Sequence, residues 1–563
     1  MDPKWYTETD RTWGDLFNEV ADRFPDNEAL IFGIERLTYR ELRRRIDVCA
    51  KGLMKIGVKR GDHVAIWMTN SPEWIYVQFA VYKLGAALLP VYTRFKQSEV
   101  EYSLKQSDSS TLIMNDRFLG KIDAMEMFKG LCPEIDQCRP GELTSERLPR
   151  LKRVVCFSEK EYPGIFPFSE IMEFGEDPSL DEALAESEQA VDPFDVMNII
   201  YTSGTTGFPK GGLSMHRNNM ACIYNTTARM GLNEKDRSLL NLPLFSNFGC
   251  MYVAGLSFMR GAGLVMQVDF SPLEAFRAVE EEKITHIYGS PAMFISYVDE
   301  PALNDFDLSS LRGGIVGGSP LPPKTMEDMV GKLGLDEALN VYGLSECGGL
   351  ATTNVADDPI DKKSNTVGVA LENCQIKIVD PETGNEVPVG SQGEVCLHDV
   401  LHGSSVGKGY YNMPEKTREA IDVERWFHTG DLGVMGEDGY LRITGRVKDM
   451  FLVGGFNVYP VEIENVMIRH PKVSKVQVVG VPDHRMGEVG MACVQLKPGT
   501  SCTEEELIDF AKEELANFKV PRYVKFVRDF PMTGSGKVKK FELREQGIQE
   551  LGLKEEYKVV QKA

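Results

Sequence analysis

Histidine and cysteine are scarce in this chain, and neither is arranged in a pattern that binds metal. The 563 residues contain 8 His and 11 Cys. The cysteines are scattered, with no C-x-x-C pair and no cluster of His and Cys at the spacing of a zinc site. An odd, dispersed set of cysteines is typical of reduced thiols and not of a disulfide framework, so we expect a cytoplasmic protein.

Basic charge is also in short supply. Lys and Arg number 63 against 84 Asp and Glu, which gives a formal net charge of −21. A field of this sign repels nucleic acid and anionic lipid, and it argues against both as main partners. It does not exclude a nucleotide ligand, because oriented backbone N–H groups and single cations bind phosphate inside acidic proteins.

Long apolar runs are absent as well. The most apolar stretch, 74–92, is interrupted by Lys83, Gly85 and Pro90, so it predicts a buried helix followed by a strand and not a membrane span. The first residues lack the pattern of a signal peptide, and the last ones carry no peroxisomal signal. We therefore expect no integral membrane association.

Helical and strand patterns alternate along the first part of the chain. The sequence predicts helices over 39–56, 72–84 and 99–107, and strands over 63–68, 111–114 and 196–201. This rhythm is typical of an α/β fold with doubly wound parallel sheets. The segment 169–190, rich in Glu, Asp and Pro, predicts a solvated connector before the strand at 196–201.

The length of the chain and the changes in its residue pattern indicate more than one domain. A chain of 563 residues is expected to form about two to four domains. Beyond Gly384, short strands and turn signals predict a small β-barrel-like part, and after Gly445 the pattern becomes α+β. We place a boundary between Lys448 and Asp449, which gives an N-terminal domain over 1–448 and a C-terminal domain over 449–563.

A string of Gly, Ser and Thr directly follows an apolar strand. It reads YTSGTTGFPKGG from Tyr201 to Gly212. Glycines let backbone N–H groups curve around phosphate oxygens, the hydroxyls add donors, and Lys210 adds a positive charge. The string is not a Walker A loop, because no Gly-Lys-Ser/Thr stands at the required spacing. A flexible surface turn is the alternative, which the density of these residues disfavours.

This string resembles the phosphate-loop signature of the adenylate-forming superfamily, which includes acyl- and aryl-CoA synthetases, beetle luciferases and peptide adenylation domains. Further motifs similar to those of the superfamily follow in order along nearly the whole chain. They are GGSP at 317–320, NVYGLSE at 340–346, YNMPEKT at 411–417, WFHTGD at 426–431, GRVKD at 445–449, GGFNVYPVEIE at 454–464 and PMTGSGK at 531–537. The ordered set most resembles an AMP-forming acid–CoA ligase.

The resemblance implies a reaction in two steps. A carboxylate attacks the α-phosphate of ATP and expels pyrophosphate, and the acyl group of the adenylate then passes to the thiol of coenzyme A. The expected partners are ATP, a carboxylic acid and CoA, with Mg²⁺ as cofactor, in a monomer or homodimer. Negative charge accumulates on the phosphoryl oxygens, so cations and oriented donors are needed there.

The resemblance also implies roles for single residues. Lys537 would bridge the acyl carboxylate and the phosphate, Ser345 would donate to the α-phosphate, and Glu346 would hold Mg²⁺. Tyr342 would lie against the adenine, and Asp431 would accept from the ribose hydroxyls. The full expected nucleotide-binding set is Thr202, Ser203, Gly204, Thr205, Thr206, Gly207, Lys210, Gly318, Ser319, Pro320, Tyr342, Gly343, Asp431 and, supporting it, Arg446.

Both steps cannot share one arrangement, because Lys537 near the phosphate would block the approach of CoA. By resemblance, a mobile C-terminal domain rotates about a hinge at Asp449 between the two steps. Gly454 and Gly455 would line the CoA path, where a Cβ would narrow it. A plain turn is the structural alternative for this pair of glycines.

The acid pocket departs from the family pattern. The segment PLFSNFG at 243–249 has Ser246 where relatives usually carry His, a loss expected to open the pocket. We predict that the pocket is lined by Ser246, Asn247, Phe248, Tyr288, Val341, Gly343, Gly348 and Gly349. The two adjacent glycines leave volume, and no acidic residue between Phe245 and Cys250 could pair with an ammonium group. The sequence therefore favours a medium-size apolar acid, aromatic, alicyclic or branched, over an amino acid.

Two other functions stay open. An adenylating enzyme without CoA transfer would share these motifs, and so would most of an AMP-binding regulator without catalysis. Retention of Lys537, Glu346 and Asp431 argues against the regulator. The direction of the reaction is not encoded in the motifs, so the same site could also make ATP from acyl-CoA, AMP and pyrophosphate.

Overall fold

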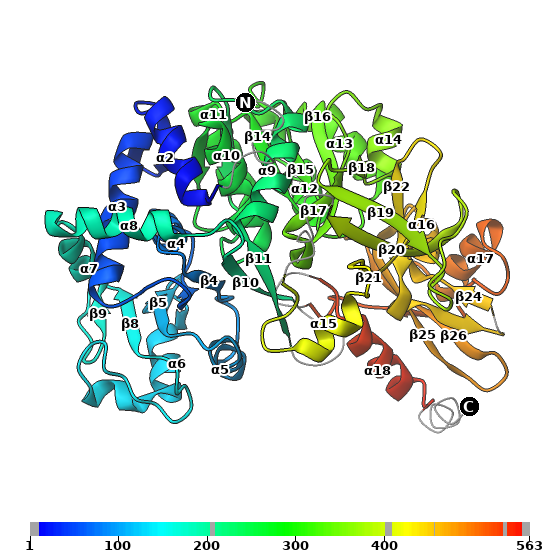
Figure 1. The fold of residues 1–563 in the computed structure, drawn as a ribbon. Helices are drawn as coiled ribbons and strands as arrows, with labels where there is room; N and C mark the ends of the chain where they lie inside the picture. The colour runs from blue at the N-terminus through cyan, green and yellow to red at the C-terminus, as the bar shows by residue number, and fades with distance from the viewer. Residues whose placement is uncertain (1–10, 203–208, 400–407, 455, 533–536, 554–563) are drawn as a thin grey trace. The chain divides into compact units, whose positions relative to one another are not determined.

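The computed structural model describes residues 11–202, 209–399, 408–454, 456–532 and 537–553 (Figure 1). The chain divides into two compact units. The first comprises 1–202, 209–375 and 397–427, and the second comprises 203–208, 376–396 and 428–563. Residues 428–448 thus group with the C-terminal part. The domain boundary expected between Lys448 and Asp449 stays a prediction.

The first unit contains two large, mainly parallel sheets, as the alternating patterns predicted. The nine-stranded sheet has, in spatial order, β18 (Val369–Ala370), β17 (Gly349–Thr353), β16 (Glu337–Leu344), β15 (Gly313–Val316), β14 (His286–Gly289), β12 (Arg237–Leu240), β13 (Gly263–Met266), β1 (Glu28–Phe32) and β2 (Glu35–Thr38). The pairs from β16 through to β1 are parallel, and the edge pairs are antiparallel.

The second large sheet has seven strands. They are, in spatial order, β11 (Lys210–Met215), β10 (Val196–Thr202), β4 (Ala87–Pro90), β3 (His63–Trp67), β5 (Thr111–Asn115), β8 (Arg153–Phe157) and β9 (Phe166–Pro167). Only β10 and β11 pair antiparallel among the strands of this sheet. A small ribbon joins β6 (Arg117–Phe118) to β7 (Ile122–Asp123).

Helices cover both sheets of this unit (Figure 1). They are α2 (Trp13–Arg23), α3 (Tyr39–Lys55), α4 (Pro72–Lys83), α5 (Gln97–Gln106), α6 (Ala124–Leu131), α7 (Phe168–Gly175), α8 (Asp181–Ala190), α9 (His216–Met230), α10 (Ala254–Arg260), α11 (Pro272–Glu282), α12 (Pro291–Val298), α13 (Pro323–Leu333), α14 (Ile360–Asn365) and α15 (Pro414–Ala420). The largest core joins residues of both sheets, such as Ile66 and Tyr288, to helix residues such as Trp74 and Phe258. Separate cores lie on the other face of each sheet. The α/β fold with doubly wound sheets is confirmed.

Helix α3 illustrates how the sequence sets an element. Thr38 and Glu41 form a reciprocal capping box at its start, which satisfies backbone N–H groups that have no partner within the helix. Leu42, Ile46 and Leu53 recur at helical spacing and are fully buried. Among the described helices, none is long and apolar enough to cross a lipid bilayer.

The segment 169–190, predicted as a solvated connector, is mostly helical. It forms most of α7 and all of α8. Of its acidic residues, Glu170, Asp181 and Glu182 stand in the first turns, where they stabilise the helix dipole. Ile171 and Leu184 are buried, so each helix has an apolar anchor that charge alone concealed.

The second unit contains two smaller sheets. The four-stranded sheet runs β19 (Cys374–Val379), β20 (Gln392–Asp399), β21 (Phe427–Met435) and β22 (Leu441–Arg446). The first residues of β19 and β21 and the last residues of β20 are assigned to the first unit. The five-stranded sheet runs β24 (Phe456–Val458), β23 (Phe451–Val453), β26 (Gly487–Leu496) and β25 (Val473–Asp483), and β27 (Tyr523–Phe526) also pairs with β26. Helices α16 (Pro460–Met467), α17 (Glu504–Glu514) and α18 (Lys540–Glu550) complete the predicted α+β part.

Candidate active site

Adjacent parallel strands place two of the predicted nucleotide motifs beside each other in the first unit. Strands β15 and β16 are parallel neighbours, in register at Val316 and Asn340. The loop with Gly318, Ser319 and Pro320 follows β15 and is exposed, while half-buried Tyr342 lies near the end of β16. Ligands of open α/β sheets bind at this carboxyl edge, so the arrangement suits the expected adenine site.

The phosphate string lies on the hairpin of β10 and β11. Thr202 ends β10 and pairs with Lys210 at the start of β11. Ser203, Gly204, Thr205, Thr206 and Gly207 lie outside the described residues. The Nζ atom of Lys210 stands 4.3 Å from the ring centroid of Tyr410, a distance typical of a cation–π contact.

Tyr410 links this hairpin to Glu346. Its backbone bridges to Gly212 on β11, and its hydroxyl donates to Glu346 Oε1 over 3.0 Å. Tyr410 is 6% exposed, and burial together with the Glu346 charge raises the pKa of its phenol. The phenol therefore stays protonated and serves as a fixed donor to the carboxylate.

Glu346 stands on the short 3-10 helix η5 (Ser345–Cys347), immediately after β16. A carboxylate is the hard oxygen ligand that Mg²⁺ prefers, with phosphates and waters supplying the other positions. The donor set therefore fits the expected ion. Glu346 would hold it, and the ion would neutralise charge on the phosphates of ATP.

The segment around Ser246 meets the phosphate motif through Asn247, whose Nδ2 donates to Ser345 Oγ over 3.4 Å. Ser246 itself is occupied locally. Its hydroxyl donates to the Pro243 carbonyl over 2.7 Å and accepts the Gly249 N–H over 3.2 Å. The Ser246 hydroxyl thus accepts a backbone N–H from the first turn of the π-helical segment η3 (Phe248–Val253).

The space beside Gly348 and Gly349 is filled by protein, which corrects the expectation that these glycines leave volume. A Cβ on Gly349 would stand 1.3 Å from Tyr252 Oη, and one on Gly348 would stand 2.8 Å from Asn218 Nδ2. The Tyr252 hydroxyl donates to the Gly348 carbonyl over 3.0 Å and accepts the Leu350 N–H. The two glycines therefore leave room for the Tyr252 side chain. From the sequence alone, glycines that make room for a protein side chain could not be distinguished from glycines that line an open pocket.

Two other residues predicted for the acid pocket are deeply packed. Tyr288 has 0% exposure, and its hydroxyl pairs with Ser238 Oγ on the neighbouring strand over 2.9 Å. Val341 is 5% exposed and belongs to the same core. Half-buried Phe248 packs against this core as well. Their role around an acyl group stays a prediction.

In the second unit, Asp431 and Arg446 are in register on β21 and β22. Arg446 Nε donates to Asp431 Oδ1 over 2.7 Å, and the Asp431 side chain is 6% exposed. The Asp431 N–H donates to Thr429 Oγ1 over 3.0 Å, which fixes the turn before it. Arg446 thus holds the carboxylate of Asp431, and the role of both residues toward the ribose stays a prediction.

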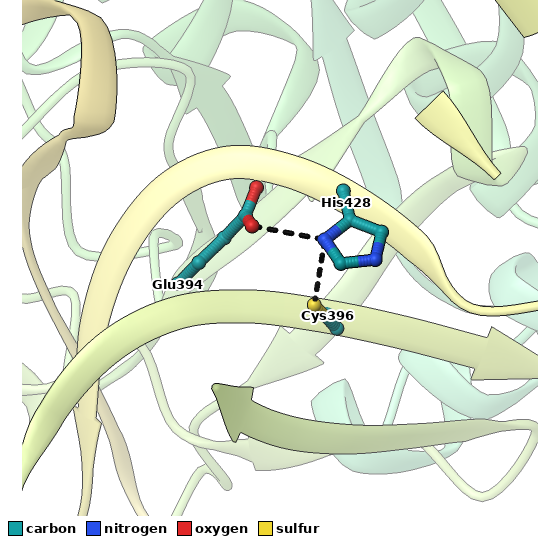
Figure 2. A group of neighbouring side chains, drawn as sticks. All are labelled: Glu394, Cys396 and His428. Carbon is teal, nitrogen blue, oxygen red and sulfur yellow. Dashed lines mark hydrogen bonds and ion pairs between the residues drawn. The ribbon is translucent and has the colours of Figure 1, made fainter. Parts of the chain in front are cut away.

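Glu394 supports the same turn from β20. Its Oε1 accepts the Gly430 N–H over 2.9 Å, and its Oε2 lies 2.9 Å from Nδ1 of His428 (Figure 2). Cys396, two residues along the strand, places Sγ 3.5 Å from the same nitrogen. No sequence motif marks this group, because its members come from two strands and match no local metal pattern.

The remaining predicted residues also lie in the second unit. Asp449 ends the short 3-10 helix η6 (Val447–Asp449), and Lys537 is exposed. Gly454 has φ +59, and a Cβ there would stand 2.7 Å from Met486 Cε. Both the left-handed backbone and the packing against Met486 therefore favour glycine at this position, whether or not CoA passes it. Gly455 lies outside the described residues.

Tyr410 and Tyr252 are the site residues that the sequence analysis did not identify. Tyr410 directly precedes the YNMPEKT motif, so its position next to a family signature was a usable signal. Tyr252 lies in an apolar run without any motif. Its partnership with Gly348 and Gly349 depends on residues about a hundred positions apart.

Comparison with known proteins agrees with the motifs. Residues 17–411 match the family described as AMP-binding enzyme, and residues 462–537 match the AMP-binding enzyme C-terminal domain. The chain is 40% identical over 544 residues to YngI of Bacillus subtilis (strain 168), named as an acyl-CoA synthetase, covering 96% of this chain and 98% of that protein. It is 36% identical over 552 residues to the mitochondrial medium-chain acyl-CoA ligase ACSF2 of Bos taurus, covering 97% and 89%.

Solved structures show the same architecture. The anthranilate CoA ligase AuaEII, in complex with anthranoyl-AMP, matches with a TM-score of 0.84 and 25% identity, covering 97% of this chain and 99% of that one. ATP-bound MatB from Rhodopseudomonas palustris matches with a TM-score of 0.79 and 26% identity, covering 95% and 99%.

Proposed function

The chain belongs to the family of AMP-binding enzymes, and we propose that within it the chain joins a medium-size apolar carboxylic acid to coenzyme A. The class of reaction follows from the family and from relatives named as acyl-CoA synthetase or ligase: the chain is an AMP-forming acid–thiol ligase. The choice of acid, the direction and the residue roles belong to the proposal.

The arrangement of three side chains supports the proposed site for MgATP. Lys210 and Glu346 come from two separate motifs, and Tyr410, next to a third, brings them together within hydrogen-bond and cation–π distance. They place one cation and one half-buried, oriented carboxylate at the base of the phosphate hairpin. This is the combination that a Mg²⁺-bound triphosphate requires, because positive charge must meet the phosphoryl oxygens.

The choice of acid rests on the character of the segment around Ser246. In the described part of this segment, Ser246, Asn247, Phe248 and Gly249 carry no charge that could pair with the ammonium group of an amino acid. Tyr252 fills the space beside Gly349, so an acyl chain could not extend there. This favours an acid with a short or medium chain over one with a long chain. The name of the Bos taurus relative, a medium-chain acyl-CoA ligase, points the same way.

In the proposed mechanism, Lys537 steadies the carboxylate and phosphate as the first bond forms, Ser345 donates to the α-phosphate, and Asp431 accepts from the ribose. Glu346 would hold Mg²⁺, which would supply positive charge to the phosphates. Rotation about Asp449 then opens the path past Gly454 and Gly455 for CoA. We place the enzyme in the cytoplasm, as a monomer or homodimer, and the same site could run the reaction toward the thioester or in reverse.

A panel of acids tests the proposal. Purified protein with ATP, Mg²⁺ and CoA is given acetate, hexanoate, octanoate, palmitate, benzoate, cyclohexanecarboxylate and several amino acids, and acyl-CoA is measured by mass spectrometry. The proposal predicts the highest kcat/KM for octanoate, benzoate or cyclohexanecarboxylate. A preference for palmitate or an amino acid would contradict the acid class, and an acyl-adenylate that never becomes a thioester would support the alternative without CoA transfer.

A further inference from the structure

Three side chains with different metal-binding atoms converge in the second unit, apart from the residues assigned to ATP, acid or CoA. They are Glu394, Cys396 and His428 (Figure 2). We propose that these residues form a binding site for a divalent transition metal, with Zn²⁺ as the best match, in addition to the Mg²⁺ that the reaction uses. The inference does not depend on the identity of the acid.

The strands create the group. Glu394 and Cys396 are two residues apart on β20, so they project from the same face, and His428 stands on the adjacent strand β21. The carboxylate oxygen, the sulfur and the ring nitrogen all lie within 4.8 Å of one another. In Figure 2 the carboxylate and the thiol both point toward the same edge of the imidazole.

The nitrogen–sulfur separation suits a tetrahedral zinc ion. With Zn–N near 2.0–2.1 Å and Zn–S near 2.3 Å, tetrahedral angles place nitrogen and sulfur about 3.5 Å apart. His428 Nδ1 and Cys396 Sγ are 3.5 Å apart. The same geometry asks for about 3.4 Å between nitrogen and a carboxylate oxygen, so Glu394 Oε2 at 2.9 Å must retreat by roughly half an ångström.

Burial gives the site a closed side and an open side. Cys396 has 0% exposure, whereas the side chains of Glu394 and His428 are 13% and 31% exposed. An ion can therefore approach along the exposed side of the imidazole and bind the sulfur, which is buried from solvent. Three protein ligands leave one position for water, as in other open zinc sites.

The ligands can bind an ion without dismantling the turn. Glu394 uses Oε1 for the Gly430 N–H and Oε2 for His428, so of its two oxygens only Oε2 needs to change partner. Binding releases the Cys396 thiol proton, and the imidazole carries its proton on Nε2 while Nδ1 binds the ion. The strands that carry Asp431 thus keep their hydrogen bonds.

A second group in the same unit serves as a comparison. His470, Cys502 and Glu506 also lie within 4.8 Å of one another. There, however, Lys472 Nζ is 2.8 Å from Glu506 Oε1, so the carboxylate already forms an ion pair with an ammonium group. A cation beside the ligands opposes a second cation, and this group is the weaker candidate.

Cobalt provides the test, because Co²⁺ replaces Zn²⁺ and a thiolate ligand gives it a charge-transfer band in the near ultraviolet. Full-length protein is stripped with EDTA and titrated with Co²⁺ in the presence of excess Mg²⁺. We expect a band that saturates at one Co²⁺ per chain and disappears on adding Zn²⁺. Cys396→Ser should abolish the band, and His428→Gln should weaken Co²⁺ binding at least about tenfold.

Cys502→Ser is the matched control and should leave the band unchanged. Thermal melting of the metal-free variants shows whether each one is folded, so that loss of the band can be assigned to a lost ligand. A band that survives in Cys396→Ser, a band lost in Cys502→Ser instead, or no band in the wild-type protein would overturn the proposal. The spectrum reports metal alone, so a failure of ligase activity would not affect the outcome.

Discussion

The hydroxyl of Tyr410 donates to Oε1 of Glu346 over 3.0 Å, while the ring of Tyr410 faces Lys210 at 4.3 Å. One buried side chain thus positions both the carboxylate expected to hold Mg²⁺ and the cation of the phosphate string. Neither charge is fixed by its own element alone, because Glu346 follows a strand end and Lys210 begins a strand after a loop.

Replacing Tyr410 with Phe tests this positioning. The ring remains, but Glu346 loses a donor, and a hydrogen bond to a charged group contributes about 1.5–3 kcal/mol. We expect the KM for MgATP and the concentration of Mg²⁺ at half-maximal rate to rise about tenfold, since 1.4 kcal/mol corresponds to a factor of ten. Initial rates across a Mg²⁺ titration measure both.

Tyr411→Phe provides the control, because the neighbouring hydroxyl pairs with Asp108 over 3.0 Å and not with Glu346. This variant should keep the Mg²⁺ dependence of the wild type. Equal shifts in the two variants would mean that Tyr410 acts through general stability alone.

Lys537→Ala separates the two half-reactions. The lysine is expected to meet developing charge during adenylation, so its loss should lower the rate of adenylate formation by about a hundredfold or more. Thioester formation from a supplied acyl-adenylate and CoA should remain within about threefold of the wild type. Similar losses in both steps would refute the assignment of Lys537 to the first step alone.

Arg446→Gln tests the support of the ribose contact. The Asp431 side chain is 6% exposed and accepts from Arg446 over 2.7 Å, so the variant removes a charged partner from a nearly buried carboxylate. We expect the KM for ATP to rise about tenfold, with partial rescue in Arg446→Lys, which keeps the charge. An unchanged KM for ATP in both variants would show that Asp431 is held without Arg446.

His216 gives the protein a defined response to acid. The ring is fully buried, its Nδ1 accepts the Trp13 N–H over 3.2 Å, and burial lowers its pKa to about 4. The unfolded chain has an ordinary pKa near 6.5 and takes up a proton first, so stability is fully present above about 6.5 and is lost as pH falls to about 4. The shift corresponds to about 3 kcal/mol of unfolding free energy.

Denaturant unfolding between pH 7 and pH 4.5 measures this effect. The wild type should lose stability with a steeper slope than His216→Gln, which cannot be protonated. His286 is also buried with a pKa lowered to about 4, so part of the slope persists in the variant. Identical slopes would contradict the role of His216.

The elements that could be predicted from the sequence are those with a strong period or a local signal. The helix predicted over 39–56 spans Tyr39–Lys55, because a capping box sets its start and an apolar stripe runs along its length. The helices within 169–190 could not be predicted from the sequence, since few of their residues are buried: Phe168, Ile171 and Gly175 in α7 and Leu184 in α8.

For the site, the ordered motifs identified residue types and their order, but not how they meet. The pairing of Arg446 with Asp431 agrees with the expectation. The Tyr410–Glu346 bond depends on residues 64 positions apart. Gly349 appeared to leave space because a missing side chain is visible in a sequence, whereas the Tyr252 ring that fills the space is not.

The most direct test of the account is the stoichiometry of the complete reaction with the acid preferred in the panel. AMP, pyrophosphate and acyl-CoA are quantified together by mass spectrometry, with and without CoA. The account predicts equal amounts of all three products when CoA is present, and no more than about one adenylate per active site when CoA is withheld. Release of ADP, or sustained AMP production that does not depend on CoA, would contradict it.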